Sequence, residues 1–287
     1  MNLQIENSAE EGLSNADFAR LCRLIYEVSG IVLNADKKTM LELRVKRRLR
    51  ILNLNSLAEY CQYLFGPRGQ KDEVVHLIDV VSTNKTDFFR EPDHFDYLVR
   101  NAIPELVARN ESGRPLTIWS AGCSSGEEPY TLAMVLSEWA ETHPGFRFEI
   151  LATDISNLVL EKAARGVFTE EVIDPVPAAL RQKYFMRSRD RSSKLYRVVP
   201  ELRRLIEFRR LNFMDADFGL PNKVDIFFCR NVIIYFDRAT QERIIQKLAA
   251  QLHPGGYAFV GHSETLHNMD LPLTAIAPAL YRKTKRG

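Results

Sequence analysis

The chain has 287 residues, of which 45% are hydrophobic and 26% are charged, and its formal net charge is +2. This length allows one large or two small domains, and the hydrophobic content is sufficient for a globular core. No apolar run approaches the roughly 20 residues of a membrane span, so we expect a protein that is not inserted in a membrane.

The cysteines and histidines indicate which kinds of protein the chain does not resemble. Four cysteines show no paired spacing, which indicates reduced thiols rather than a disulfide framework. Six histidines form no H-x-x-x-H or Cys/His cluster, so we expect no metal site. The first 15 residues are polar and acidic and do not resemble a signal peptide. Together these features predict a cytoplasmic protein.

The first part of the chain is predicted to be helical. Apolar residues at helical spacing predict helices over residues 14–29, 36–53, 56–65 and 70–82. The second of these helices is strongly basic, with seven Lys or Arg between Lys37 and Arg50 and a single acid. A solvated face with snorkelling side chains is one explanation. Docking of an acidic partner is favoured, because like charges at i, i+4 cost stability. The lack of interleaved aromatic residues favours a protein partner over a nucleic acid.

A polar and aromatic segment connects the helices to the rest of the chain. Between residues 82 and 92, Asn, Thr and Arg flank Phe88 and Phe89. The segment either folds over a pocket or forms a capped helix junction with both Phe in the core, and composition does not decide between these. A further helix extends to about residue 108. We therefore expect a helical N-terminal domain over 1–108, a linker over 109–115 and a second domain over 116–287.

The second domain opens with a strand, a turn of small residues and a helix. The strand contains Leu116, Ile118 and Trp119, and the turn Gly122–Gly126 has almost no side-chain bulk, so a ligand can approach its backbone closely. Two carboxylates, Glu127 and Glu128, then open the helix. They would repel a phosphate, and they are suited to an amine or to adenosine hydroxyls.

An acid follows the second strand, about thirty residues after the turn. Asp154 lies where a doubly wound sheet binds ribose hydroxyls. It is equally able to cap the helix that follows, and the two roles are compatible. The ribose role is favoured because of the turn that precedes it.

The remaining segments continue the α/β pattern after an interruption. Residues 172–210 are predicted to form an inserted β subdomain, with strands near 195–199 and 205–210. Strands at 224–229 and 257–260 flank a helix over 238–251, and residues 280–282 suit a last antiparallel edge strand. The fold class is therefore α/β, with a small all-helical N-terminal domain before a doubly wound sheet.

Six motifs resemble those of the chemotaxis protein methyltransferases of the CheR type. The resemblance covers residues 14 to 282, with the motifs in order and at compatible spacings. The matching segments are TNKTDFFR at 83–90, SGEEPY at 125–130, TDI at 153–155, KYFMR at 183–187, FCRNVIIYF at 228–236 and GHSE at 261–264.

This resemblance implies an activity. The family transfers a methyl group from S-adenosylmethionine to glutamate side chains of membrane chemoreceptors, the methyl-accepting chemotaxis proteins. Glutamate methyl esters and S-adenosylhomocysteine are the products. The basic helix would then meet the receptor's cytoplasmic helical bundle through Arg44, Lys46, Arg47, Arg48 and Arg50.

The resemblance also implies site residues. Arg90 and Tyr235 would orient the reacting groups, and no general base is expected because a glutamate carboxylate is already ionised at neutral pH. The residues implied to bind the cofactor are Asn84, Thr86, Arg90, Glu128, Asp154, Asn212, Phe213, Arg230 and Asn231.

Three questions stay open at this stage. In some family members the inserted subdomain also binds a receptor's C-terminal peptide, but the turn at 188–193 has no glycine, which leaves peptide binding undecided. A nucleic-acid methyltransferase would share the cofactor fold, although no base-flipping motif is apparent. A non-catalytic signalling adaptor that binds the cofactor is the other alternative.

Overall fold

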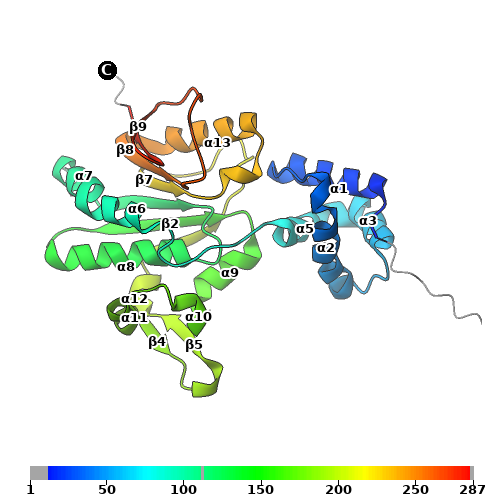
Figure 1. Ribbon diagram of the computed structural model, residues 1–287, viewed down its shortest axis with the longest axis horizontal. Helices are drawn as coiled ribbons and strands as arrows, with labels where there is room; N and C mark the ends of the chain where they lie inside the picture. The colour runs from blue at the N-terminus through cyan, green and yellow to red at the C-terminus, as the bar shows by residue number, and fades with distance from the viewer. Residues whose placement is uncertain (1–11, 111–112, 285–287) are drawn as a thin grey trace, which may run out of the picture. The chain divides into compact units, whose positions relative to one another are not determined.

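The structure is a computed structural model that describes residues 12–110 and 113–284. The chain divides after Thr83 into two compact units, a helical unit and an α/β unit (Figure 1). Among the described residues, no helix is both long and apolar enough to cross a membrane.

The helical unit confirms the predicted helices and adds detail at their ends. Ser14 caps the first helix by accepting a hydrogen bond from the Asp17 amide, and Gly30 ends it in the left-handed conformation with φ 75°. The predicted helix over 70–82 is two helices, which Glu73 separates. The elements are α1 (Asn15–Ser29), η1 (Ala35–Lys37), α2 (Lys38–Leu52), α3 (Leu57–Phe65), α4 (Pro67–Asp72) and α5 (Val74–Val81).

The core of the helical unit uses the apolar face of α2. Leu41, Val45 and Leu49 recur at i, i+4 and i+8 and are buried, as are Leu21 and Ile25 of α1. The remaining circumference of α2 carries the basic residues, so burial of the apolar stripe leaves those residues on the other faces of the helix.

The α/β unit begins earlier than expected. Helices α6 (Pro92–Tyr97) and α7 (Ile103–Arg109), joined by the π-helical turn η2 (Leu98–Ala102), belong to this unit. Their side chains Phe95, Leu98 and Ile103 lie in one hydrophobic cluster with strand residues Ile118 and Phe259.

The structure therefore does not divide the chain at residue 108. Helical periodicity shows that these helices have an apolar face, but it does not show which core that face joins. Of the expected linker, residues 111 and 112 lie outside the described residues.

A seven-stranded sheet forms the centre of the α/β unit, in the order β6-β2-β1-β7-β8-β10-β9. The first five strands pair in parallel, and β10 pairs antiparallel with β8 and β9. The predicted doubly wound arrangement is confirmed, whereas β10 is not the edge strand, because β9 lies beyond it. The strands are β1 (Leu116–Ala121), β2 (Phe148–Asp154), β6 (Ile206–Arg210), β7 (Val224–Cys229), β8 (Leu252–Val260), β9 (Leu273–Ala277) and β10 (Leu280–Lys283).

Helices follow the parallel strands as crossover connections. These are α8 (Glu127–Thr142) after β1, α9 (Asn157–Arg165) after β2, and α13 (Arg238–Gln251) after the turn η4 (Ile233–Tyr235). The strand order reverses between β1 and β7. Such a switch point is where doubly wound sheets bind ligands, outside the carboxyl ends of the strands.

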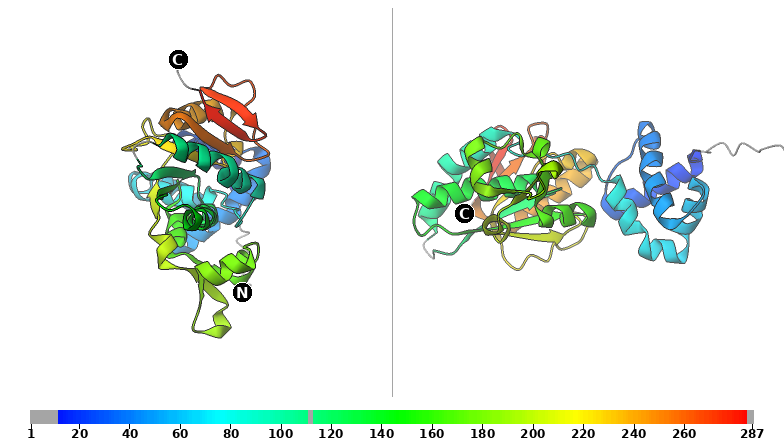
Figure 2. Two further views of the ribbon diagram at one scale, coloured as in Figure 1. Left: turned by 90° about the vertical axis from the view of Figure 1, so that its left-hand side faces the viewer. Right: turned by 90° about the horizontal axis from the view of Figure 1, so that it is seen from below.

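A small sheet of order β3-β5-β4 projects from the α/β unit (Figures 1 and 2). Of the two strands predicted for the insert, 195–199 is confirmed as β5. The strand at 205–210 is also present, as β6, but its assignment to the insert is wrong, because β6 pairs with β2 in the main sheet. A short strand pattern does not reveal its partner. The elements are β3 (Val167–Thr169), α10 (Glu170–Ile173), α11 (Ala178–Tyr184), β4 (Phe185–Arg187), η3 (Arg191–Ser193), β5 (Leu195–Val198) and α12 (Pro200–Arg203).

Candidate active site

The predicted site residues of the α/β unit gather at the carboxyl ends of the parallel strands. Ala121 at the end of β1 pairs with Thr153 near the end of β2. The amides of Gly122 and Cys123 then both donate to the carbonyl oxygen of Thr153, at 2.8 and 2.9 Å. These bonds hold the small-residue turn against the end of the neighbouring strand, as expected for a switch-point crevice.

The small-residue turn is tightly constrained. Gly122 has φ 87° and Gly126 has φ 101°, in the left-handed region that favours glycine. A Cβ atom at Gly122 would lie 2.5 Å from a methyl group of Val232, so no larger residue fits without movement. The Ser124 hydroxyl donates to the carbonyl oxygen of Asn84 at 2.9 Å, which connects the turn to the predicted residues of the 84–90 segment.

Asp154 lies at the edge of this turn. One of its carboxylate oxygens accepts from the Ser124 amide at 2.9 Å, and the other accepts from the Ser156 amide at 3.0 Å. Two backbone amides therefore set the orientation of the carboxylate. The suggested cap role is wrong, because Ser156 is the N-cap of α9 and accepts from the Val159 amide.

Two further predicted residues, Asn212 and Phe213, follow β6, the strand that pairs with β2 as far as Asp154. The amide of Leu211 donates to the carbonyl oxygen of Asp154 at 2.9 Å. The side-chain oxygen of Asn212 accepts from the Met214 amide at 3.0 Å, and the Phe213 ring makes an edge contact with Phe218. Both predicted residues are buried and are positioned by local contacts.

Glu128 and Arg230 form a buried ion pair. Arg230 Nε donates to Glu128 Oε2 at 2.7 Å, and the Ser120 hydroxyl donates to Glu128 Oε1 at 2.7 Å. Arg230 Nη1 also donates to the carbonyl oxygen of Arg90 at 2.6 Å and lies 3.2 Å from His94 Nδ1. The sequence suggested that Arg230 contacts the cofactor, whereas in the structure its guanidinium bonds to groups of the protein.

The segment around Arg90 is strained. Phe89 and Glu91, on either side of it, have φ values of 55° and 54°, which are uncommon for residues other than glycine. Thr131 Oγ1 accepts from the Phe89 amide at 3.2 Å, and Glu91 Oε1 accepts from the His262 amide at 3.2 Å. Together with the Arg230 bond, these contacts fix the backbone of Arg90.

The structure confirms the core interpretation of the Phe88–Phe89 segment for Phe88 and only in part for Phe89, which is half-buried. Phe88 is buried and makes edge contacts with Phe168 and Phe185 at 5.0 and 5.7 Å between ring centroids, as a core residue does. Arg90 and Thr86 are only half-buried. The aromatic residue anchors the segment, and the polar residues remain partly accessible.

The segment after β7 carries the last predicted residues. Asn231 adopts a left-handed conformation with φ 59°, and its side-chain oxygen is buried without a hydrogen-bond partner in the described structure. Tyr235 ends the turn η4 and is half-buried. An unpartnered buried oxygen is costly unless a ligand satisfies it.

The polar groups at these strand ends fit S-adenosylmethionine. Glu127, Glu128 and Asp154 place three carboxylates around a turn without bulky side chains, and burial raises the pKa of Glu127. Carboxylates accept from ammonium and hydroxyl groups, and a cationic ligand offsets their charge. The Asn231 oxygen adds one acceptor that lacks a donor. The same set would repel a phosphate.

A cluster of Glu91, His94 and His262 has its ligand atoms within 4.8 Å of one another. The Arg230 guanidinium lies 3.2 Å from His94 and 3.5 Å from Glu91, so a cation bound there would be repelled. Burial and Arg230 together lower the pKa of His94 to about 4. The cluster therefore serves as the surroundings of Arg230, and it gives no support for a metal site.

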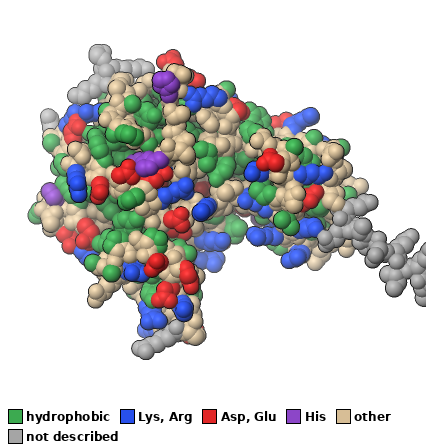
Figure 3. All heavy atoms as spheres, in the orientation of Figure 1, with side chains coloured by type: hydrophobic (Ala, Val, Ile, Leu, Met, Phe, Trp, Pro, Cys, Tyr) green, Lys and Arg blue, Asp and Glu red, His purple; other side chains and the backbone are tan. Residues whose placement is uncertain are grey.

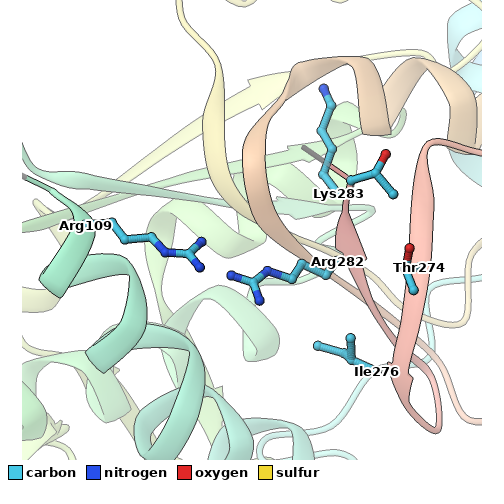
Figure 4. Close-up of a pocket in the computed structure, with 6 residues that line it drawn as sticks. Arg109, Thr274, Ile276, Arg282 and Lys283 are labelled. Atoms are coloured by element: carbon cyan, nitrogen blue, oxygen red, sulfur yellow. The ribbon is translucent and has the colours of Figure 1, made fainter. Parts of the chain in front are cut away.

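A cavity of about 320 Å³ lies away from these strand ends, against β9 and β10 (Figure 4). Arg109 and Arg282 point toward one another there, and both pair with Glu105. Lys283 donates to the carbonyl oxygen of Leu252 at 2.7 Å. The Arg and Lys side chains that line this cavity already bond to groups of the protein, so we do not assign the candidate active site to this cavity.

The predicted docking residues lie in the helical unit and fall into two groups. Arg48 donates two hydrogen bonds of 2.8 Å to Glu73, and Arg44 donates to the carbonyl oxygens of Val81 and Ser82. Arg47 and Arg50 are exposed, and Lys46 is half-buried. Lys and Arg side chains are spread over the visible face of this unit (Figure 3). The first group bonds within the helical unit, and in the second group Arg47 and Arg50 are exposed to solvent.

Three residues near the site had no predicted role, namely Glu91, His94 and Glu264. The motif at 261–264 was the one available signal for Glu264, and it indicated a resemblance without indicating a contact. Glu91 and His94 follow Arg90 closely in the chain, but nothing in their spacing indicates that they surround Arg230.

Comparisons with known proteins cover both units. Residues 84–278 match the family model of the CheR methyltransferase SAM-binding domain, and residues 16–82 match that of the CheR methyltransferase all-alpha domain. The boundary between the two matches agrees with the division of the structure after Thr83.

Several curated relatives are similar over nearly their whole length. The chain is 38% identical to a chemotaxis protein methyltransferase of Borreliella burgdorferi, over 94% of this chain and 95% of that protein. It is 38% identical to chemotaxis protein methyltransferase 2 of Pseudomonas aeruginosa, over 92% of each. It is 37% identical to the chemotaxis protein methyltransferase of Escherichia coli, over 99% of this chain and 96% of that protein.

Proposed function

Since this chain belongs to the CheR family of chemotaxis methyltransferases, whose cofactor is S-adenosylmethionine, we propose that it methylates glutamate side chains of membrane chemoreceptors. The products are a glutamate methyl ester on the receptor and S-adenosylhomocysteine. We propose that the reaction takes place in the cytoplasm, on the receptor's helical bundle.

The arrangement of Arg90 is the observation that carries the choice of a carboxylate substrate. Its backbone is held in a strained segment by Thr131 and Arg230. Its guanidinium makes one hydrogen bond within the described residues, to the carbonyl oxygen of Lys85 at 3.4 Å. Arginine presents donors in a fork that matches a carboxylate. A positioned arginine with donors to spare suits a glutamate side chain.

The chemistry then asks for alignment more than for proton transfer. S-adenosylmethionine, when bound, supplies an electrophilic methyl group on a sulfonium centre. A glutamate carboxylate with a pKa of about 4.3 is ionised at neutral pH and needs no general base. Holding the two reactants in line can contribute up to about 7–11 kcal/mol to lowering the barrier. Arg90 and Tyr235 are the residues we propose for this alignment.

The remaining site residues are proposed to bind the cofactor. We assign the ribose hydroxyls to Asp154, whose orientation two amides fix. Glu128 would accept from the amino group, in the orientation set by Arg230 and Ser120. Arg230 itself is proposed to act through Glu128 and Arg90 rather than by direct contact. The other proposed cofactor contacts are Asn84, Thr86, Asn212, Phe213 and Asn231.

Receptor docking is proposed for the accessible part of α2. Arg47 and Arg50 are exposed, as are the apolar side chains of Leu43 and Ile51, at 62% and 64%. Residues 43, 47, 50 and 51 share one helical face. A face that is both basic and apolar is better explained by contact with an acidic amphipathic helix of a receptor bundle than by exposure to solvent alone.

The small sheet remains a candidate for binding a receptor's C-terminal peptide. Its outer strands β3 and β4 are edges to which an extended peptide could add. The turn between β4 and β5 has no glycine, but Lys194 adopts the left-handed conformation there, with φ 47°. The missing glycine therefore does not prevent the hairpin from forming.

The proposal is tested with S-adenosylmethionine carrying a labelled methyl group and with membranes rich in chemoreceptors. Label on receptor protein that is released by alkali is expected, because methyl esters are base-labile. Arg90→Ala should lower this transfer strongly while the melting temperature stays close to that of the unmodified protein. Label appearing on added RNA would instead indicate a nucleic-acid methyltransferase. Cofactor binding without transfer to any receptor would indicate a signalling adaptor.

A further inference from the structure

A buried carboxylate lies beneath the segment that connects β7 to η4. Glu264 is 6% exposed, and each of its two carboxylate oxygens accepts two backbone hydrogen bonds. Oε2 accepts from the amides of Asn231 and Gly261, at 2.8 and 2.6 Å. Oε1 accepts from the amides of Val232 and Ile233, at 2.8 and 2.9 Å. One side chain thereby binds three consecutive amides of the 231–233 turn.

The chemistry of this arrangement calls for a carboxylate. All four partners are N–H donors, and a carboxylate accepts on both oxygens without donating. Successive amides that converge on one anion form a nest, which stabilises the negative charge. Burial raises the pKa of Glu264, and the four amide bonds oppose that shift.

The held turn has a conformation that it would not adopt readily by itself. Asn231 has φ 59°, in the left-handed region, which asparagine adopts more often than other residues except glycine but which it leaves for other conformations in most chains. Gly261 is packed so closely that a Cβ atom there would lie 2.7 Å from Asn231 Nδ2 and 2.9 Å from Glu264 Oε2. Strained backbone of this kind persists where the surrounding contacts over-determine it.

Residues 261–264, which include Glu264, also contact the segment that follows Arg90. The His262 amide donates to Glu91 Oε1 at 3.2 Å, and the His262 ring lies 3.1 Å from the Asp93 carboxylate. Residues 261–264 therefore join the segment after β7 to the segment that follows Arg90.

From these contacts we infer that Glu264 is a positioning residue for cofactor binding. Its carboxylate holds the 231–233 turn in the geometry that presents Asn231 and Tyr235 to the cofactor. The inference rests on the proposed function, because it assumes that the crevice beside Asn231 binds S-adenosylmethionine. It predicts that the turn is already formed before the cofactor arrives.

The first test replaces Glu264 by glutamine and measures the affinity for S-adenosylhomocysteine by calorimetry. A glutamine keeps the shape but turns an amide group toward backbone N–H donors, so that two of them lose their acceptor. We expect the dissociation constant to rise about tenfold or more. Glu264→Asp, which keeps the charge at a shorter reach, should recover part of the affinity.

Glu73→Gln is the matched control. Glu73 is a buried carboxylate of the helical unit, 1% exposed, so its replacement should lower the stability of that unit without changing the affinity for S-adenosylhomocysteine. If Glu264→Gln lowers the melting temperature but leaves the affinity unchanged, Glu264 is structural only and the inference is wrong. If the unmodified protein does not bind S-adenosylhomocysteine, the proposed function fails instead.

A second variant covers the case in which Glu264→Gln does not fold. Gly261→Ala crowds Asn231 and should weaken S-adenosylhomocysteine binding. Gly256→Ala, inside β8, the strand that Gly261 directly follows, crowds the carbonyl oxygen of Asp225 at 2.6 Å and should leave binding unchanged. Equal affinities in the two variants would contradict the positioning role.

Amide hydrogen exchange of the unmodified protein gives a measurement that needs no variant. The amides of residues 231–233 and 261 should exchange slowly before any cofactor is added. Fast exchange that slows only with S-adenosylhomocysteine would show that the cofactor, and not Glu264, orders the turn.

Discussion

Each unit contains a buried arginine–glutamate pair, and the two pairs differ in what they connect. In the helical unit Arg48 makes two hydrogen bonds of 2.8 Å to Glu73, which also accepts from the Tyr60 hydroxyl. In the α/β unit Arg230 binds Glu128 and, in addition, the carbonyl oxygen of Arg90. The first pair, with Tyr60, joins α2 and α3 to the junction between α4 and α5. The second joins a strained segment to the first turn of α8.

An ion pair of the same two residue types is thus expected to have a structural role in the helical unit and a positioning role in the α/β unit. A buried ion pair is weak evidence for stability, because desolvation offsets much of the attraction. Its value in the α/β unit is therefore expected to lie in geometry. The helical unit also carries exposed arginines that lie outside such pairs. We expect those arginines to contact a partner protein.

Breaking either pair should give the largest effect. We expect Arg230→Met and Arg48→Met each to lower the free energy of unfolding of its own unit by about 3–5 kcal/mol, because a buried glutamate loses its partner. Only Arg230→Met should also abolish binding of S-adenosylhomocysteine. Trp119 and Trp139 are the two tryptophans of the chain and both lie in the α/β unit, so their fluorescence reports that unit alone.

Calorimetry on the two variants separates the alternatives. If Arg48→Met weakens S-adenosylhomocysteine binding as much as Arg230→Met does, the distinction between a structural and a positioning pair is wrong.

The next largest difference between the two units should lie in the pH dependence of their stability, because the Arg230 network contains a histidine. The pKa of His94 is about 4 in the folded protein, lowered by burial and by Arg230, and about 6.5 when unfolded. Between these values the unfolded chain binds a proton that the folded protein does not. Stability of the α/β unit should therefore fall by about 3 kcal/mol as the pH drops from 6.5 to 4.

Urea unfolding followed by tryptophan fluorescence at several pH values measures this slope. His94→Gln removes the titrating group and should flatten the slope over that interval. A variant that retains the full slope would assign the pH dependence to other groups.

A smaller effect is expected at Asp154, which is half-buried. Asp154→Asn keeps one oxygen but loses the charge, and we expect the affinity for S-adenosylhomocysteine to fall about tenfold. Asp190→Asn is the control, because Asp190 accepts from the amide two residues later at 3.0 Å, as Asp154 does. Unchanged affinity in Asp154→Asn would rule out the ribose role.

The accessible arginines of α2 should have the smallest effect on the protein itself. Arg47→Glu combined with Arg50→Glu is expected to change the free energy of unfolding by less than about 1 kcal/mol. Receptor methylation should fall sharply, and its rate in the unmodified protein should decrease as salt is added, since the screening length shortens. Arg23→Glu, on exposed α1 surface of the same unit, should methylate receptors normally.

Charge reversal at Arg44 or Arg48 would not test docking cleanly. Both side chains bond to groups inside the helical unit, so a loss of activity could follow from unfolding. Receptor methylation that is unaffected by Arg47→Glu with Arg50→Glu would remove the docking role from this face.

The sequence by itself determined the local elements of this protein. Apolar residues at helical spacing predicted α1, α2 and α13, and the β-prone runs before Gly122, Asp154 and Arg230 predicted β1, β2 and β7. These signals are local, because side-chain periodicity depends on the backbone conformation of neighbouring residues. The position of Asp154 after the second predicted strand also marked it as a candidate ligand of ribose hydroxyls.

The tertiary structure decided which elements and side chains meet. It assigned α6 and α7 to the α/β core, moved β6 from the insert to the main sheet, and paired Arg230 with Glu128 across a separation of 102 residues. It also showed that Arg44 and Arg48 of α2 bond within the helical unit, whereas Arg47 and Arg50 are exposed. Such contacts depend on partners distant in the chain, and a single sequence carries no local signal for them.

The left-handed residues Phe89, Glu91 and Asn231 illustrate the reason. Phe89 and Glu91 depart from their own conformational preference, so local rules predict the opposite of what is observed, and Asn231 adopts a conformation that asparagine tolerates but that its sequence does not require. Bonds from Arg230, Thr131 and Glu264, all distant in sequence, hold these conformations. The candidate site is therefore the part of the chain where long-range contacts outweigh local preference.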